Sequence, residues 1–163
     1  MKMMRSIKEN WKTYLFWVGL SEGVGAVSGL LTRNGVKEFN ATVTQPPLSP
    51  PPMVFPIVWT ILYALMGIGA ARVSLTPESQ ARSRGLNLFM TQLAMNFAWS
   101  IVFFNFEAYG FAALWLAILW AVIAAMTIEF RKTDNLAGLI QIPYLLWVAF
   151  ALYLNLGVWT ING

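Results

Sequence analysis

Amides and aromatic rings recur at helical spacing in one apolar stretch of the sequence. Asn96, Trp99 and Phe103 follow Gln92 at intervals of four, three and four residues. Residues at these intervals share one face of an α-helix. Indole N–H groups and amides need hydrogen-bond partners in apolar surroundings. This face therefore predicts either a ligand-binding surface with rings for stacking or buried amides that pair between helices.

Two other apolar stretches carry aromatic residues at the same kind of spacing. Their shared faces hold Phe55, Trp59 and Tyr63 in one stretch, and Tyr144, Trp147, Ala151 and Asn155 in the other. If the three faces converge, they enclose an aromatic chamber with a few polar groups, which is typical of a site for a flat apolar molecule. An aromatic core whose amides pair between helices fits the spacing equally well.

Glu22 is the one charged residue between Thr13 and Thr32. A charge in the middle of a membrane helix costs about 2.5–3.5 kcal/mol on insertion scales. We therefore expect Glu22 to face the interior of a helix bundle or a water-filled cavity. It could be a neutral acid bonded to a neighbouring helix or a contact for a ligand or proton, and the residues leave both interpretations open.

The residue types present do not favour an enzyme. The chain has no cysteine and no histidine, which excludes disulfides, zinc–thiolate clusters, histidine-ligated haem and a serine nucleophile with a histidine base. The carboxylates of Glu22, Glu107, Glu129 and Asp134 are scattered along the chain without acid–base spacing. We expect no catalytic residue, no metal ion and no cofactor.

Charge distribution indicates which elements must position these side chains. Of the 163 residues, 58% are hydrophobic and 11% charged, against about 25% charged in a typical soluble domain. Charge-free stretches long enough for about 20 residues of membrane helix predict five spans, at residues 12–31, 53–72, 85–105, 108–130 and 136–160. Their continuous apolar character does not fit an alternating barrel strand. We predict an all-α membrane protein, a single domain of residues 1–163 folded as a five-transmembrane-helix bundle.

The cations are distributed unequally between the two ends of such a bundle. One end carries Lys2, Arg5, Lys8, Lys12, Arg72, Arg82, Arg84, Arg131 and Lys132, and the other carries Arg33 and Lys37. The positive-inside rule then places the N-terminus in the cytoplasm. A basic face mixed with exposed aromatic residues is not evident, so nucleic-acid binding is not expected.

The predicted connection at residues 32–52 is long and rich in proline. Its rigid part contains Pro46, Pro47, Leu48, Pro50 and Pro51. Proline fixes φ and favours extended conformations before it, so this segment predicts either a lid across the mouth of the bundle or a rigid spacer before the second helix.

Small residues recur at intervals of four in the first predicted span. Gly19 and Gly23 form one pair, and Gly25 and Gly29 form another. This spacing favours close helix packing, either within one bundle or across a homodimer.

Three ordered motifs resemble the translocator protein family, also called the tryptophan-rich sensory protein family. The motifs are "PPMVFPIVWTILYALMG", "QLAMNFAWSIVFF" and "PYLLWVAFALYLN". The resemblance covers roughly residues 20–160 and implies a five-helix bundle with a pocket closed by the first loop. It also implies binding of porphyrins, sterols and synthetic isoquinoline or benzodiazepine ligands. The family's pocket positions match Trp59, Tyr63, Asn96, Trp99, Trp147 and Ala151. The spacing argument adds Phe55, and the cost of a charge within a membrane helix adds Glu22.

The sequence departs from the family in the lid and near the C-terminus. Leu48 stands where the family's lid tryptophan is expected, and Gln45 stands where its lysine is expected. The cholesterol motif of the family requires a cation shortly after a tyrosine, and no cation follows Tyr153.

The leading hypothesis is a membrane receptor for flat hydrophobic ligands, chiefly porphyrins, in the regulation or transport of tetrapyrroles. Sterol and membrane lipid are further expected partners, and a bacterial cell membrane is the expected location, or the mitochondrial outer membrane in a eukaryote. One alternative is a porphyrin-degrading activity in which Trp59 and Trp147 act as redox partners. Another is a proton-coupled exporter that uses Glu22.

Overall fold

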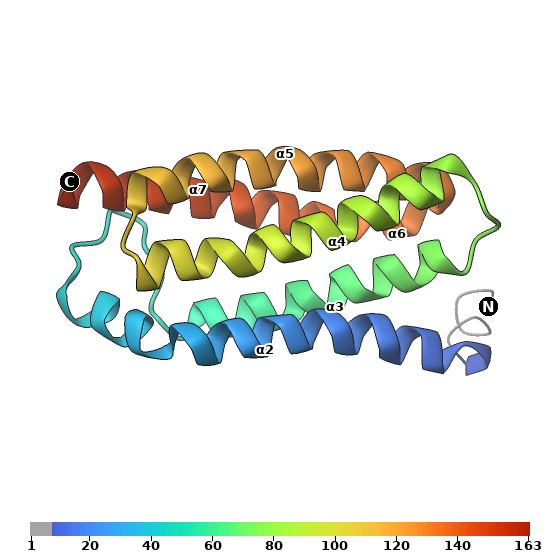
Figure 1. Ribbon diagram of the computed structural model, residues 1–163, viewed down its shortest axis with the longest axis horizontal. Coiled ribbons are helices and arrows are strands. Elements are labelled where there is room, and N and C mark those ends of the chain that lie inside the picture. The colour runs from blue at the N-terminus through green and yellow to red at the C-terminus, as the bar shows by residue number, and fades with distance from the viewer. Residues whose placement is uncertain (1–7) are drawn as a thin grey trace.

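The structure, a computed structural model that describes residues 8–163, is a bundle of long helices aligned along one axis (Figure 1). Five helical segments are long and apolar enough to cross a membrane, which confirms the predicted fold class. The helices are α2 (Trp11–Thr42), α3 (Val54–Ser74), α4 (Gln80–Ser100), η1 (Ile101–Asn105), α5 (Tyr109–Thr133), α6 (Asn135–Leu139) and α7 (Ile142–Asn162). Lys2 and Arg5, two of the cations used for the predicted topology, lie outside the described residues.

The first helix is longer than the sequence predicts. We expected a loop over residues 32–52, but α2 continues to Thr42 and the loop covers residues 43–53. The extra turns pack against η1 through Gly35 and Phe39, and just before them the Asn105 amide donates to the Leu31 carbonyl at 3.0 Å. At 1.5 Å per residue, the 32 residues of α2 measure about 48 Å, whereas about 30 Å of hydrocarbon needs about 20 residues.

The fifth predicted span is two helices rather than one. The predicted helix at 136–160 is interrupted between α6 and α7. Pro143 stands in the first turn of α7, and proline cannot continue an α-helix from the preceding turn. The Gln141 amide stabilises the break because it donates to the carbonyls of Leu65 at 3.1 Å and Ala137 at 3.3 Å.

The third span also changes geometry near its end. After Ser100 the chain forms the π-helical turn η1, which the Phe106 N–H closes with a bond to the Ile101 carbonyl at 3.1 Å. Such turns are often found at functional sites. Phe103 and Phe104 lie within it, and both rings contact Phe39 of α2, with centroid distances of 5.3 and 5.4 Å.

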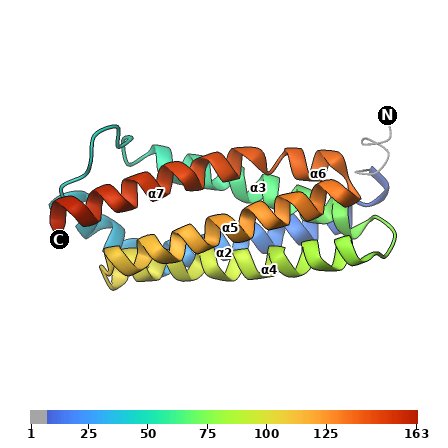
Figure 2. The same cartoon turned by 90° about the horizontal axis from the view of Figure 1, so that it is seen from above.

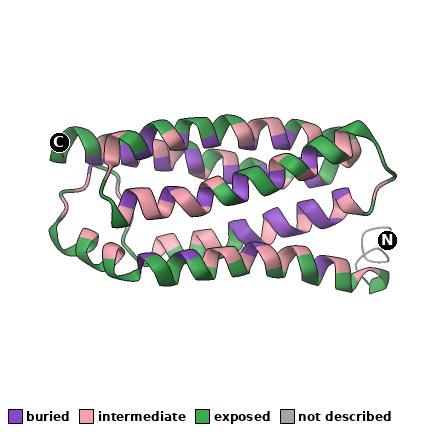
Figure 3. Cartoon of the chain, viewed as in Figure 1, coloured by how far each residue is buried: buried purple, intermediate pink, exposed green. Residues whose placement is uncertain are grey.

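Buried and exposed residues alternate along the helices, with buried positions between helices and exposed positions outside (Figure 3). Seen from the direction of Figure 2, α3 and α7 lie on the side opposite to α4, and the 43–53 loop projects near the C-terminal part of α7. Many large apolar side chains are exposed on the outer surface. This surface suits a bundle surrounded by lipid.

Candidate ligand-binding cavity

A cavity of about 540 Å³ lies inside the bundle, between α2, α3, α4, η1, α7 and the 43–53 loop. The predicted binding residues all line it. They are Glu22 from α2, Phe55, Trp59 and Tyr63 from α3, Asn96 and Trp99 from α4, and Trp147 and Ala151 from α7. The three faces drawn from helical spacing therefore converge on one space.

Aromatic rings form much of the cavity wall. The rings of Trp59 and Trp147 approach edge to face, with centroids 6.5 Å apart and planes at 88°. Phe55 lies 5.8 Å from Trp147. On the α4 side, Trp99 stacks on Phe103 at 5.2 Å and 29°. These rings offer broad apolar surfaces from more than one direction.

Three polar side chains form a hydrogen-bonded chain at the base of the cavity. The Asn96 amide nitrogen donates to the Tyr144 hydroxyl at 2.9 Å, and that hydroxyl donates to Oε1 of Gln92 at 2.6 Å. Gln92 and Tyr144 are fully buried and do not line the cavity. Because the amide nitrogen of Asn96 is engaged, its Oδ1 is the atom left to accept a hydrogen bond.

The indole N–H groups of two cavity tryptophans differ in their bonding. Trp99 Nε1 donates to Asn155 Oδ1 at 3.0 Å, and the Asn155 amide donates to the Tyr109 carbonyl at 2.8 Å. Trp147 Nε1 is buried and has no partner among residues 8–163. Thus the Trp99 ring is fixed by protein contacts, whereas the Trp147 N–H remains an unused donor.

The proline-rich loop packs on α7 and does not insert most of its residues into the cavity. Gln45 and Pro52 line the cavity, whereas the predicted lid residues Pro46, Pro47, Leu48, Pro50 and Pro51 do not.

Contacts with α7 hold this loop in place. The Tyr153 hydroxyl donates to the Pro47 carbonyl at 2.8 Å, and the Asn162 amide donates to the Thr44 carbonyl, also at 2.8 Å. The side chain of Pro46 occupies the space beside Gly157. These contacts position the loop at the end of the cavity.

One wall of the cavity was missed by the sequence prediction. Besides Glu22, α2 contributes Gly25, Ala26, Ser28, Gly29, Thr32, Arg33, Val36, Phe39 and Asn40. The signal was present, because Gly29, Arg33, Val36 and Asn40 follow Glu22 at helical intervals of 7, 11, 14 and 18 residues. For Arg33, Val36 and Asn40 it was overlooked because residues 32–52 were expected to form a loop.

The glycine pairs of α2 have different surroundings. A Cβ at Gly25 would lie 2.5 Å from the Tyr63 ring, so this glycine permits close contact with α3. Gly19, Gly23 and Gly29 have no described atom within 4 Å of such a Cβ. Homodimerisation through this helix stays a prediction.

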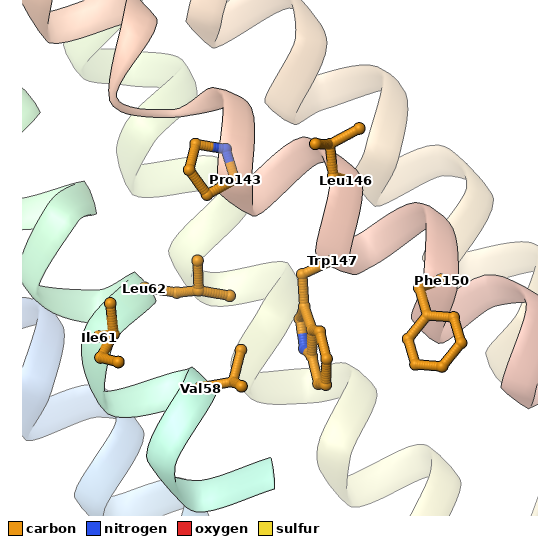
Figure 4. A pocket seen from close by; sticks show the side chains of 7 residues that line it. All are labelled: Val58, Ile61, Leu62, Pro143, Leu146, Trp147 and Phe150. Carbon is orange, nitrogen blue, oxygen red and sulfur yellow. The ribbon is translucent and has the colours of Figure 1, made fainter. Parts of the chain in front are cut away.

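A second hollow of about 440 Å³ lies between α3 and α7 (Figure 4). Its lining is apolar and consists of Val58, Ile61, Leu62, Pro143, Leu146, Trp147 and Phe150. Trp147 also lines the main cavity. The side chains of Ile61 and Leu146 are largely exposed, so this groove opens on the outer surface of the bundle.

Comparisons with known proteins match the chain to one family. Residues 17–160 match the TspO/MBR family. The chain is 38% identical over 122 residues to Protein CrtK of Rhodobacter capsulatus, covering 74% of this chain and 76% of that protein.

Other relatives come from distant organisms. The chain is 32% identical over 151 residues to the tryptophan-rich protein TspO of Chlorobaculum tepidum, covering 92% of this chain and 96% of that protein. It is 35% identical over 124 residues to the human translocator protein, covering 75% and 73% of the two chains.

Proposed function

The chain belongs to the TspO/MBR family of multi-pass integral membrane proteins, and from this membership and the cavity we propose that it is a receptor for flat hydrophobic molecules. Porphyrins are the proposed main ligands, in the regulation or transport of tetrapyrroles. Sterol and membrane lipid are proposed as further partners. We place the N-terminus in the cytoplasm on the distribution of cations.

The aromatic walls are the observation that carries this proposal. Trp59, Trp99 and Trp147 come from three different helices and line one cavity. Aromatic pairs contribute about 0.5–1.5 kcal/mol beyond the burial of their area. The cavity volume of about 540 Å³ falls in the range of about 300–1,000 Å³ that small-molecule sites occupy. A flat aromatic ligand would use these walls fully.

One polar group of the lining supports a ligand that donates a hydrogen bond. Asn96 Oδ1 is available as an acceptor, whereas the Trp147 N–H, which has no partner in the described chain, has no surface open to the cavity. A buried polar group left unpaired costs about 1–3 kcal/mol. The ring nitrogens of a porphyrin point to the centre of the macrocycle, so a group on the edge of the ring would be the one to bond Asn96.

The test is a titration of the reconstituted protein with protoporphyrin IX, followed by the porphyrin absorption band. This readout does not depend on the number of tryptophans. Asn96→Leu and Trp147→Ala should each weaken affinity by about tenfold or more, since 1.4 kcal/mol is a factor of ten. Trp159→Ala is the control, because Trp159 lies outside the cavity lining and should change affinity little.

Two results would contradict the proposal. One is normal binding by Asn96→Leu, and the other is an equal loss in Trp159→Ala and Trp147→Ala. Illumination of the bound porphyrin separates binding from degradation. A loss of absorbance with a defined product, abolished by Trp59→Phe or Trp147→Phe, would identify the porphyrin-degrading alternative instead.

A further inference from the structure

The α2 wall of the cavity carries two opposite charges. Glu22 and Arg33 are the charged residues among those lining the cavity. Eleven residues separate them, which is three helical turns, so both lie on one face of α2. At 1.5 Å per residue, their positions are about 16 Å apart along the helix. The cavity therefore has an acidic part and a basic part.

Arg33 is free to bind an external anion. The ion pairs among residues 8–163 join Arg72 to Asp134, and Arg84 and Lys132 to Glu129. Arg33 belongs to none of them. Its guanidinium offers five N–H donors in a planar arrangement that matches the two oxygens of a carboxylate. Such charge-assisted, bidentate contacts are roughly twice as strong as neutral hydrogen bonds.

Arg33 also lies at a suitable depth. It follows Trp11, the first residue of α2, by 22 residues, or about 33 Å of helix, which is close to the thickness of the hydrocarbon core. A charge can remain solvated at that border. Gln45 and Pro52 of the loop line the cavity too, and neither is charged. Arg33 is thus the lining cation that a ligand's acidic group can reach while its ring stays in the cavity.

We propose that Arg33 determines ligand specificity by binding a carboxylate of a flat ligand whose ring packs against the aromatic walls. The inference rests on the proposed function and narrows its ligand class to planar molecules with an acidic side group. Glu22 favours the same orientation of the ligand. Its carboxylate lies at the other end of the α2 wall and would repel the ligand's acidic group there. The ligand's carboxylate then points to Arg33 and its ring lies deeper in the cavity.

The experiment compares protoporphyrin IX with its uncharged dimethyl ester. Both are titrated into the full chain in nanodiscs of zwitterionic phosphatidylcholine, as wild type, Arg33→Gln, Arg33→Lys and Lys37→Gln. Lys37 is the matched control, because it lies one turn further along α2 and does not line the cavity.

We expect the wild type and Lys37→Gln to bind the acid about tenfold or more tightly than the ester. Arg33→Gln should lose this preference through weaker binding of the acid, with the ester unchanged. Arg33→Lys should retain part of it, because lysine keeps the charge without the bidentate geometry.

Several results would overturn the inference. An acid-to-ester ratio that is unchanged in Arg33→Gln, or equally reduced in Lys37→Gln, would show that general surface charge determines the preference. Equal binding of acid and ester by the wild type would show that Arg33 does not bind the ligand's carboxylate, and would leave the proposed function standing. If the wild type bound neither porphyrin, the proposed function would fail and the inference with it.

Discussion

The same long helices pack tightly at one end of this bundle and enclose a cavity at the other end. At the packed end, which surrounds the second half of α3, side chains lie between the helices, and Met66, Ala70, Val73, Phe89 and Phe130 have no exposed surface. At the cavity end, next to the 43–53 loop, the helices enclose an empty volume of about 540 Å³. The Gln92–Tyr144–Asn96 chain separates the two ends.

The difference between the ends follows from the size of the residues between the helices. At the packed end, small residues allow backbones to touch, as at Gly67, where an added Cβ would lie 2.5 Å from the Val18 Cα. The Arg72–Asp134 ion pair closes the same end. At the cavity end a close approach occurs at Gly35, where an added Cβ would lie 2.7 Å from the Phe104 carbonyl oxygen, but large rings such as Trp59 and Trp99 line the space between the helices. We infer that stability depends on the packed end and ligand binding on the cavity end.

The largest expected effect on stability is that of Gly67→Val. Its Cβ would meet Val18 and the Trp17 carbonyl, and these backbone atoms move only if α2 moves. Overpacking costs about 1–3 kcal/mol, so the melting temperature should fall by about 2–12 °C at about 2–4 °C per kcal/mol. Porphyrin affinity measured below the transition should be unchanged. The control is Gly19→Val, where no described atom lies within 4 Å. Equal losses in both variants would show that the close contact of Gly67 with α2 is not the cause of the loss.

Tyr144→Phe should lower both stability and ligand affinity, because the Tyr144 hydroxyl belongs to the hydrogen-bonded chain that separates the packed end from the cavity end. The change leaves the buried amides of Gln92 and Asn96 without their shared partner, at about 1–3 kcal/mol. Porphyrin affinity should also fall several-fold, since the Asn96 amide is no longer held. Adding Gln92→Leu removes one orphaned amide, so the double variant should cost less than the sum of the single changes in thermal unfolding. Additive costs would argue against the chain of bonds.

Tyr153→Phe should change ligand kinetics and leave stability nearly unchanged. It removes the hydrogen bond to the Pro47 carbonyl, one of the contacts that hold the loop at the cavity end. A net hydrogen bond of about 0.5–1.5 kcal/mol corresponds to a dissociation rate about 2- to 10-fold faster, measurable by stopped-flow displacement of porphyrin. Thr160→Val, on the same helix, breaks only a local bond to Gly157 and serves as control. An unaltered dissociation rate would show that the loop does not retain the ligand.

Leu48→Gly should have the smallest effect. Leu48 is 80% exposed and has a φ of 70°, a conformation that costs a residue with a side chain about 1–2 kcal/mol. Glycine relieves this strain but gains freedom in the unfolded chain, so the melting temperature should rise by no more than a few degrees. A clear fall in melting temperature would mean that the Leu48 side chain makes a stabilising contact.

Much of the architecture could be predicted because membrane helices leave a strong pattern in composition. The gaps between charged residues predicted five spans, and the spacing of Asn96, Trp99 and Phe103 predicted residues that the structure brings to one cavity. The first prediction depends on local composition and the second on helical periodicity, and a single sequence records both directly.

The features that were missed depend on contacts between distant segments. Residues 32–42 are too polar for a predicted span, and their helix is supported by Phe39 against η1. The break before α7 combines a local cause, Pro143, with a distant one, the Gln141 bond to the Leu65 carbonyl. The partners of Asn96 and Trp99 likewise come from α7, and no pattern within α4 specifies them.

Because α2 is longer than the hydrocarbon core, the thickness of the host membrane affects how the cavity binds charged ligands. A helix longer than the hydrocarbon layer accommodates the mismatch by tilting or by locally thickening the bilayer. In a thicker, sterol-rich membrane, the turn that carries Arg33 approaches the acyl chains, where its attraction to a carboxylate is screened less. In a thinner membrane the same turn is surrounded by water and salt, which weaken that attraction. Lipid composition would therefore adjust affinity for acidic ligands without any change in the residues of the cavity.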